Sequence, residues 1–460
     1  MPRADAPPPS QTTGPVTASR RAAADVLVDL RNGMLLDAAF ERRTGGLDAR
    51  DRRWAQELLW STLRRRAWLD ALLAERVRGG LARLDADVND LLRLGAYQLL
   101  FMRSVPAYAA IAQTVELAKQ RHGIGASKLV NAVLRRIDRE RQAAESGGVG
   151  SAITVAEPAD ALDALALRHS HPRWLVARWV ARFGLPDGER LLAANNSEAP
   201  VVARPWGVVR EQLEAALESA GVRVEEAPGA LWARDSIQIA PGASLTELGA
   251  FRQGLFFVQD PASTLVAQYA AFPDDATVAD VCSAPGGKTL ELSRTARAVA
   301  AGDRSWARLQ RVVANVKRLG ATNVFPYVGD ARVPPLREMD GVLVDAPCTG
   351  TGTFRRHPDA RWRLKVSDLA VMGALQRDIL HAAASAVRPG GLLVYSTCSL
   401  EPEENDAQVD AFLADRADFT LEPPPAGAVP DAVLDGGRLR VLPHHHGVDG
   451  AFAARLRRAA

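Results

Sequence analysis

The sequence predicts a multidomain fold: an all-helical N-terminal domain, a small α+β module, and a C-terminal α/β domain built on a parallel sheet. The chain has 460 residues, a length that suits two to four domains. Apolar residues recur at helical spacing through its first third. From about residue 255, short apolar runs alternate with amphipathic segments, which is typical of a parallel sheet covered by helices.

Composition places the chain among ordinary globular proteins, with 47% hydrophobic and 24% charged residues. No apolar run approaches the roughly 18 residues of a membrane span. The first residues, "MPRADAPPPSQTTG", lack the apolar core of a secretory signal, so residues 1–16 are predicted to be a disordered lead. Three cysteines are too few for a disulfide framework. We therefore expect a cytoplasmic protein.

The N-terminal domain is predicted to span residues 17–141 and to be entirely helical. Apolar residues follow a helical period in five segments, at 17–30, 54–77, 88–102, 110–123 and 126–139. Residues 142–165 are rich in Gly, Ser and Ala without a clear period, which indicates a linker that turns helical toward its end.

Charge is unevenly spread along the chain. The net charge is only +3, but residues 1–141 hold 24 Lys and Arg against 16 Asp and Glu, a net of +8. An excess of basic charge on one domain favours a polyanionic partner such as a nucleic acid. A solvated, arginine-rich helical surface is the other interpretation, and charge alone leaves both open.

Residues 166–254 are predicted to form the small α+β module. An amphipathic helix over 171–184 is followed by a short strand near 199–207 and a helix over 210–222. Residues 255–460 form the α/β domain, with strand candidates at 276–281, 298–302, 323–329, 340–345 and 391–397 and helices over 305–320 and 367–387. Ligands of such sheets bind beyond the carboxyl ends of the strands.

The stretch "VADVCSAPGGKT" (278–289) ends in Gly-Lys-Thr and suggests a phosphate-binding loop. That loop needs a glycine at the position occupied by Cys282, so the pattern fails at its first residue. What remains is a strand that ends in Asp280 and a tight Pro-Gly-Gly turn. A ligand other than a triphosphate is expected there.

Acidic residues end three successive strands. Asp303 follows Asp280 by 23 positions, the spacing of a carboxylate that binds ribose hydroxyls, and Asp330 ends the next strand, where it could accept a hydrogen bond from an adenine amino group. Together they predict a nucleoside cofactor. The alternative is that such acids cap the following helices.

Two thiols follow the fourth and fifth strands. Cys348 lies in "DAPCTGTG", beside Asp345, and Cys398 lies in "YSTCSLEPEEN". A thiolate is a strong nucleophile, and a helix that starts at Pro402 would help to lower its pKa. The pattern predicts covalent catalysis on an electrophilic ring carbon, although either cysteine alone could be a small buried residue.

The motifs "DVCSAPGGKT", "DAPCTGTGTFRRHPDARWR" and "YSTCSLEPEEN" closely resemble those of the bacterial RNA 5-methylcytosine methyltransferases of the Sun/Fmu group. "GLFFVQDPAS" (254–263) resembles the segment that leads into their catalytic domain, and residues 91–137 resemble their NusB-like RNA-binding domain. The resemblance implies a Rossmann-like catalytic domain, S-adenosylmethionine as cofactor and 16S ribosomal RNA as substrate.

The resemblance also implies roles for four residues. Cys398 would attack C6 of cytosine, and Cys348 would assist release of the methylated product. Asp345 would hydrogen-bond the ring at N3 and at the exocyclic amine. Lys288 falls where the family has a lysine near the cytosine, although a solvated surface amine is the other interpretation.

Further residues are assigned to binding. Cofactor contacts are expected from Cys282, Ser283, Ala284, Pro285, Gly286, Gly287, Lys288, Asp303, Asp330, Asp345 and Pro347. Phosphates that flank a flipped or single-stranded cytosine are expected to contact Arg355, Arg356, His357 and Arg361. No metal is expected at His444–His446, because adjacent side chains on an extended chain point in alternate directions.

Three alternative functions differ in the residues or the substrate that they require. A non-catalytic RNA-binding or antitermination factor would not need Lys288, Asp345, Cys348 and Cys398 together. A DNA C5-methyltransferase uses the Pro-Cys thiol as nucleophile and lacks a cysteine in the later motif, so Cys398 argues against it. Another RNA, such as tRNA, is an alternative substrate.

The expected protein is a monomer that binds RNA, either naked or in an assembling small subunit, and does not bind membranes.

Overall fold

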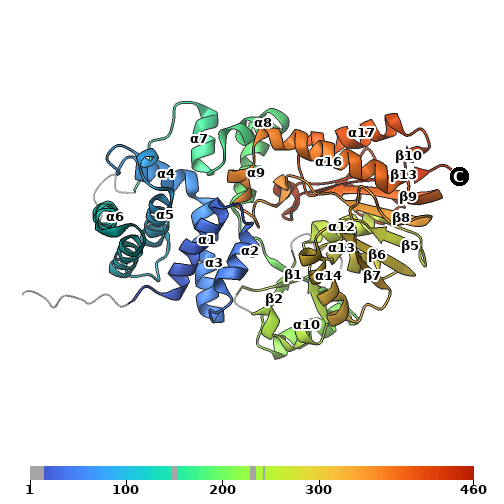
Figure 1. Cartoon of the computed structure of the whole chain (residues 1–460), viewed down its shortest axis with the longest axis horizontal. Helices are drawn as coiled ribbons and strands as arrows, with labels where there is room; N and C mark the ends of the chain where they lie inside the picture. The colour runs from blue at the N-terminus through green and yellow to red at the C-terminus, as the bar shows by residue number, and fades with distance from the viewer. Residues whose placement is uncertain (1–14, 147–152, 228–234, 242–243) are drawn as a thin grey trace, which may run out of the picture. The chain divides into compact units, whose positions relative to one another are not determined.

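The computed structural model describes residues 15–146, 153–227, 235–241 and 244–460 (Figure 1). The chain divides between Arg182 and Phe183 into two compact units. Nearly all of the expected disordered lead, residues 1–14, lies outside the described residues. No helix in the described part of the chain has the length and apolar character needed to cross a lipid bilayer.

The first unit is helical, as the sequence predicts. Its helices are α1 (Ala18–Arg31), α2 (Leu36–Thr44), α3 (Ala49–Arg64), α4 (Arg66–Ala74), α5 (Ala86–Phe101), α6 (Ala107–Glu145), α7 (Ala161–Arg168) and most of α8 (Arg173–Phe183). Leu58, Leu59 and Leu91 are among the fully buried side chains of its core. Gly123, with φ of 79°, interrupts α6 between the two helices expected there, since glycine adopts positive φ without strain. The short helix α2 is an addition to the predicted elements.

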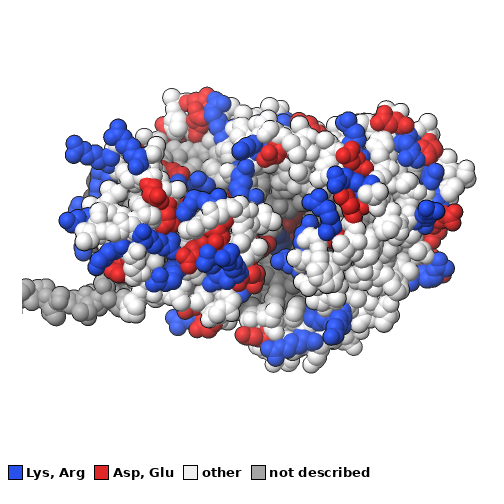
Figure 2. Space-filling view, in the orientation of Figure 1, with Lys and Arg blue, Asp and Glu red and all other residues white. Residues whose placement is uncertain are grey.

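Many arginines of this unit are engaged in ion pairs. Arg93 contacts Asp70 and Asp90, both at 2.6 Å, and Arg121 contacts Asp25 and Asp87. Figure 2 shows basic and acidic side chains interspersed on the face in view. Part of the basic excess is therefore neutralised within the unit, and the charge still fits either interpretation.

The second unit begins with a small antiparallel sheet. Its strands are β1 (Val201–Pro205), β2 (Val224–Glu226), β3 (Ile237–Ile239) and β4 (Phe256–Val258), in the order β2-β3-β1-β4. The accompanying helices are α9 (Leu185–Asn196), α10 (Arg210–Ser219) and α11 (Gly249–Arg252). Leu213 and Leu217 of α10 pack with Ile237 and Phe256 of the sheet in one buried cluster. This is the predicted α+β module.

The large sheet has nine strands within the part of the chain that the structure describes. They are β5 (Thr277–Asp280), β6 (Ala298–Asp303), β7 (Val324–Val328), β8 (Met339–Asp345), β9 (Val387–Thr397), β10 (Phe419–Leu421), β11 (Leu434–Asp435), β12 (Arg438–Val441) and β13 (Ala451–Arg458). Five of them run parallel in the order β7-β6-β5-β8-β9, and β13, β12 and β11 continue the sheet antiparallel, with β10 also paired to β13. The predicted α/β domain is confirmed, with an antiparallel extension.

Helices cover both faces of this sheet (Figure 1). They include α12 (Pro261–Ala270), α13 (Gly287–Leu292), α14 (Trp306–Leu319), α16 (Val366–Ala384) and α17 (Asp406–Asp415). Two short helices, α15 (Ala360–Arg363) and α18 (Pro443–His446), follow β8 and β12 in the chain. One buried cluster includes Leu265 of α12 and Val312 of α14, and another includes Ile379 of α16 and Phe412 of α17. Because both faces are covered, a central strand such as β8 is apolar throughout its middle.

The strand order reverses between β5 and β8. β6 and β7 lie on one side of β5, whereas β8 and β9 lie on the other. Helix crossovers leave in opposite directions at such a point, which opens a crevice beyond the carboxyl ends of the two strands. The turns that carry the predicted site residues follow these strand ends.

Candidate active site

The Gly-rich turn after β5 is built by close backbone packing. The amide of Ser283 donates to the carbonyl of Gly302 in β6 at 2.8 Å. A Cβ on Gly287 would lie 3.1 Å from Nε2 of Gln259, and Gly286 has a φ of 108° that favours glycine. The turn leads directly into α13. It forms a narrow cradle whose shape depends on both glycines.

Buried polar atoms around this turn fit a polar ligand. Asp280 accepts a hydrogen bond from Thr289 on Oδ2 at 2.7 Å, while its Oδ1 and the Oγ of Ser283 have no hydrogen-bond partner in the described residues. Burial raises the pKa of Asp280 to about 7. These atoms and the glycine cradle suit the nucleoside and amino-acid parts of S-adenosylmethionine.

The other residues of the turn differ in exposure. Cys282 is half-buried, and burial raises the pKa of its thiol above the ordinary value. The carbonyl of Ala284 accepts from Arg308 at 2.9 Å, and Pro285 is exposed. A thiol with a raised pKa is a poor nucleophile, so Cys282 suits a packing role better than a chemical one.

Asp303 and Asp330 both have partners in their own loops. Oδ1 of Asp303 accepts from the amide of Ser305 at 2.8 Å. Both oxygens of Asp330 are held by Arg332, whose hydrogen bonds lower the pKa of Asp330 to about 2. Asp303 is the last residue of β6, and Asp330 follows β7. Their contacts with a cofactor stay a prediction.

Lys288 is joined to Asp345 across the switch point. Its Nζ donates to Oδ2 of Asp345 at 2.8 Å, and Oγ of Ser396 donates to Oδ1 at 3.0 Å. The Lys288 side chain is 15% exposed. Burial lowers its pKa, but Asp345, with a smaller effect from Cys398, raises the pKa above the ordinary value overall. Lys288 is therefore a charged and largely buried group, and the interpretation as a solvated surface amine is wrong.

The two thiols predicted to react lie in contact. Sγ of Cys348 is 3.4 Å from Sγ of Cys398. The turn after β8 brings Cys348, the turn after β9 brings Cys398, and the amide of Gly352 donates to the carbonyl of Cys398 at 2.9 Å. The hydrogen bond to Cys398 and burial raise the pKa of Cys348 well above the ordinary value. Pro347, a predicted cofactor contact, is exposed beside this pair.

The prediction that an α-helix begins at Pro402 is wrong. Pro402–Glu404 form a single 3₁₀ turn, and α17 begins only at Asp406. Asn405 has φ of −116° and ψ of −99°, which breaks the regular helix between the two elements. Activation of Cys398 by the start of an adjacent α-helix is therefore not supported.

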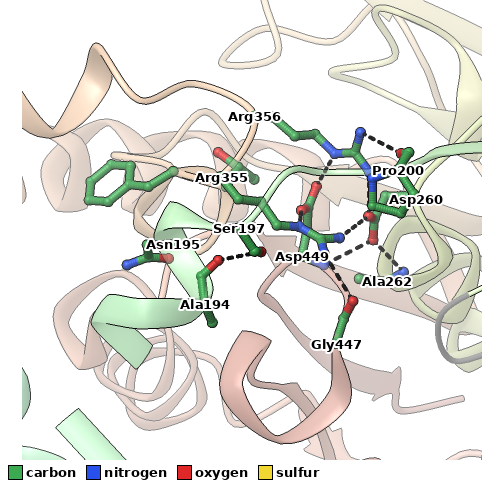
Figure 3. A network of polar contacts seen from close by, with 12 residues as sticks. Ala194, Asn195, Ser197, Pro200, Asp260, Ala262, Arg355, Arg356, Gly447 and Asp449 are labelled. Atoms are coloured by element: carbon green, nitrogen blue, oxygen red, sulfur yellow. Dashed lines mark hydrogen bonds and ion pairs between the residues drawn. The ribbon is translucent and has the colours of Figure 1, made fainter. Parts of the chain in front are cut away.

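Arg355 and Arg356 form a buried ionic cluster with Asp260 and Asp449 (Figure 3). Arg355 contacts Asp449 at 2.5 Å and Asp260 at 2.7 Å, and Arg356 contacts the same two carboxylates at 2.7 and 2.6 Å. The amide of Asp449 also donates to Asp260 at 3.1 Å. The two acids were not among the predicted site residues; their place inside the "FVQDPAS" and "VDGAF" segments was the available signal.

Two of the four predicted phosphate contacts are wrong. Arg355 is 5% exposed and held by its two carboxylates, while Arg361 is fully buried. Arg361 donates to the carbonyl of Asn195 at 2.9 Å and to Oδ1 of Asn196 at 2.7 Å. Both arginines therefore fix internal loops. Arg356 and His357 keep partial exposure, and their contact with RNA stays a prediction.

The three consecutive histidines lie on the short helix α18 and not on an extended chain, so the geometric argument made for them was wrong. His444 and His445 come within 4.8 Å of Asp187 through their ligand atoms. Asp187 is also paired with Arg190, whose charge opposes a cation there. The absence of a metal stays a prediction.

Comparison with known proteins covers nearly the whole chain. The family model described as 16S rRNA methyltransferase RsmB/F matches residues 267–457. The NusB family matches residues 17–139, and the ferredoxin-like domain of RsmF/B-like methyltransferases matches residues 171–242. The three matches follow the order of the helical, α+β and α/β parts.

Individual relatives agree with the family models. A probable ribosomal RNA small subunit methyltransferase B of Synechocystis is 33% identical over 94% of this chain and 96% of its own. Ribosomal RNA small subunit methyltransferase B of Vibrio cholerae is 35% identical over 95% of this chain and 96% of its own. The crystal structure of PH0851 is 26% identical, covers 95% of this chain and 98% of its own, and has a TM-score of 0.78. The chain thus belongs to the RsmB/F family of 16S rRNA methyltransferases and is an RNA methyltransferase that uses S-adenosylmethionine.

Proposed function

We propose that this protein methylates C5 of a cytosine in 16S ribosomal RNA through a transient bond between Sγ of Cys398 and C6 of the base. The observation that carries the proposal is the thiol pair, with Sγ atoms 3.4 Å apart at neighbouring strand ends. The Lys288–Asp345 pair lies at the same edge of the sheet. One sulfur can form the bond while the second assists its cleavage.

The residues divide the reaction into addition and release. Cys398 adds as a thiolate to C6, which places electron density on C5 and on the N3 edge of the ring. We assign the hydrogen bonds at that edge to Asp345, which can accept from the exocyclic amine and from N3 once N3 has gained a proton. Lys288 holds the Asp345 side chain in place. S-adenosylmethionine, when bound at the Gly-rich turn, supplies the methyl group. Proximity of C5 to that group is what the site mainly provides.

Release removes the proton from C5. The electron pair of the C5–H bond re-forms the C5–C6 double bond as the C6–S bond breaks and Cys398 leaves as a thiolate. Cys348, in contact with the departing sulfur, is the base that we assign to this proton. Because its pKa is raised, few molecules carry Cys348 as a thiolate at neutral pH, and release should become faster as pH rises.

The relatives and the N-terminal unit support this choice of substrate. The two relatives named above carry names that refer to the small-subunit ribosomal RNA. The N-terminal unit, which matches the NusB family, is a candidate RNA-binding domain beside the catalytic domain. The cytoplasm, where this RNA is assembled into subunits, is the proposed compartment. No metal takes part in the proposed chemistry.

The test is an adduct assay on a denaturing gel. Wild type, Cys348→Ala and Cys398→Ala are each incubated with S-adenosylmethionine and unmethylated 16S rRNA, with tRNA as a parallel substrate. A protein–RNA adduct that accumulates only with Cys348→Ala on 16S rRNA supports the proposal. An adduct that survives Cys398→Ala would reverse the two thiol roles, and an adduct on tRNA alone would change the substrate.

A further inference from the structure

Glu404 is a buried carboxylate directly behind the thiol pair. It is fully buried on the 3₁₀ turn after β9. Oε1 accepts from the amide of Thr349 and from Nε2 of Gln376, both at 2.9 Å. Oε2 accepts from the hydroxyls of Thr349 and Ser399. Four donors thus occupy the four lone-pair positions of one carboxylate.

These donors belong to the two thiol-bearing turns. Thr349 follows Cys348 in the chain, and Ser399 follows Cys398. Gln376 of α16 also donates to the carbonyl of Pro347 at 2.9 Å, the residue before Cys348. Residues on both sides of Cys348, and the residue next to Cys398, are therefore tied to one side chain. Movement of Glu404 would move both sulfurs.

All four donors to Glu404 are neutral groups. Lys288, the cation of this site, is paired with Asp345 instead. Burial of a charge without a cation is costly, so a carboxylate at this position must be stabilised by its complete set of hydrogen bonds. The negative charge of Glu404 acts on the neighbouring thiol of Cys348. It is one cause of the raised pKa of Cys348, after the hydrogen bond to Cys398, burial and the charge of Cys398.

The field is uneven across the two sulfurs. Lys288 is electrostatically coupled to Cys398, and Glu404 to Cys348. A positive charge favours a thiolate and a negative charge favours a thiol. The charge next to Cys348 therefore differs in sign from the charge that acts on Cys398.

We propose that Glu404 is a positioning residue that holds the two thiols in contact and, through its charge, makes Cys348 and Cys398 chemically unequal. This inference rests on the roles proposed above for the two cysteines. Its geometric and electrostatic content does not require RNA or cofactor, so it can be tested separately from the methyl transfer reaction.

The first test measures alkylation of each cysteine by iodoacetamide as a function of pH, in the full-length protein without RNA, with peptide mass spectrometry as the readout. Glu404→Gln keeps the size and removes the charge, and Glu403→Gln makes the same change on an exposed neighbour. In Glu404→Gln, the pH at which alkylation of Cys348 is half-maximal should fall by about one pH unit or more. In Glu403→Gln, this midpoint for Cys348 should match that of wild type. An unchanged Cys348 midpoint in a folded Glu404→Gln protein overturns the inference.

The second test uses methyl transfer and Glu404→Asp, which keeps the charge but is too short to reach both turns. Its Cys348 midpoint should stay near that of wild type while kcat falls at least tenfold and KM for RNA changes less than twofold. Wild-type kcat in Glu404→Asp would overturn the positioning role. One combination of results separates the two proposals. If the Cys348 midpoint falls as expected in Glu404→Gln but no cysteine variant forms an adduct with RNA, the role of Glu404 stands and the proposed function is refuted.

Discussion

The Nζ atom of Lys288 lies 2.8 Å from Oδ2 of Asp345, so that the first turn of α13, directly after the Gly-rich turn, and the last residue of β8 form an ion pair across the switch point of the sheet. The pair links the turn proposed to hold the cofactor with the carboxylate proposed to hold the base. One contact therefore couples the two binding functions of the site.

Replacement of Lys288 by Met should reduce kcat for methyl transfer by about 10²–10³-fold, since a charged hydrogen-bond donor at a reacting centre contributes about that much. The fold should persist, because Met fills similar space. The rate is measured with radiolabelled S-adenosylmethionine at saturating RNA. Lys317→Met, a change of an exposed lysine on α14, is the matched control. Equal rates for the two variants would contradict a role for the Lys288 charge.

Gly352 separates the thiol turn from the chain before β13. A Cβ on Gly352 would lie 2.7 Å from the carbonyl oxygen of Cys398 and 2.7 Å from Cα of Gly450. Both contacts are backbone atoms, so Gly352→Ala must displace the Cys398 turn. Because misplacement by about 1 Å can cost 10²-fold in rate, kcat should fall by about that factor. Gly46→Ala, where a Cβ meets nothing within 4 Å, should leave the rate unchanged.

Arg355→Met should lower the free energy of unfolding by about 3–5 kcal/mol, because it leaves Asp260 and Asp449 as buried acids with one fewer cation. Urea denaturation at pH 7.5 measures the change. Arg223→Met is the control, since this exposed arginine pairs with the exposed Glu225 at the surface and its loss should cost less than about 1 kcal/mol. A change of under 1 kcal/mol for Arg355→Met would show that the cluster contributes little to stability.

Asp280→Asn should make the protein less sensitive to pH between about 4 and 7. The pKa of Asp280 is raised to about 7 in the folded protein, so the folded state holds a proton that the unfolded state releases near pH 4. Stability from this group is therefore present at low pH and is lost as pH rises through that window.

Urea midpoints of wild type and Asp280→Asn across pH 4.5–7.5 should diverge in favour of the variant, with a full effect on the order of 3–4 kcal/mol. Asp274→Asn, on an exposed residue, controls for the change of net charge. If the urea midpoints of wild type and Asp280→Asn change in parallel with pH, the pKa of Asp280 is not raised in the folded protein.

The sequence predicted the elements and the place of the site because both depend on local patterns. Apolar runs that alternate with helical periods mark β5 to β9, and polar residues at strand ends meet at one edge of a parallel sheet. The contact between Cys348 and Cys398 follows from that rule once the two strands are neighbours. Local pattern was sufficient for these features.

Exposure of the arginines could not be predicted in the same way. "FRRHPDARWR" has the composition of a surface loop, yet the partners of Arg355 lie 94 and 95 residues away in the chain. The tie between Glu404 and Thr349 spans 55 residues. Whether a charged side chain faces solvent or a distant carboxylate is set by tertiary packing, and neither period nor composition carries that information.

The ionic cluster also bears on the order in which the chain becomes an enzyme. Asp449 and Gly450 join the arginine-bearing loop only when the segment before β13 is in place, since Gly450 donates to the carbonyl of Gly352 at 2.8 Å. During synthesis this segment emerges about 50 residues after Cys398, at a rate of roughly 5–20 residues per second. A nascent chain thus carries both sulfurs for several seconds before Asp449 and Gly450 can contact the loop after Cys348, and these contacts are completed only when β13 forms.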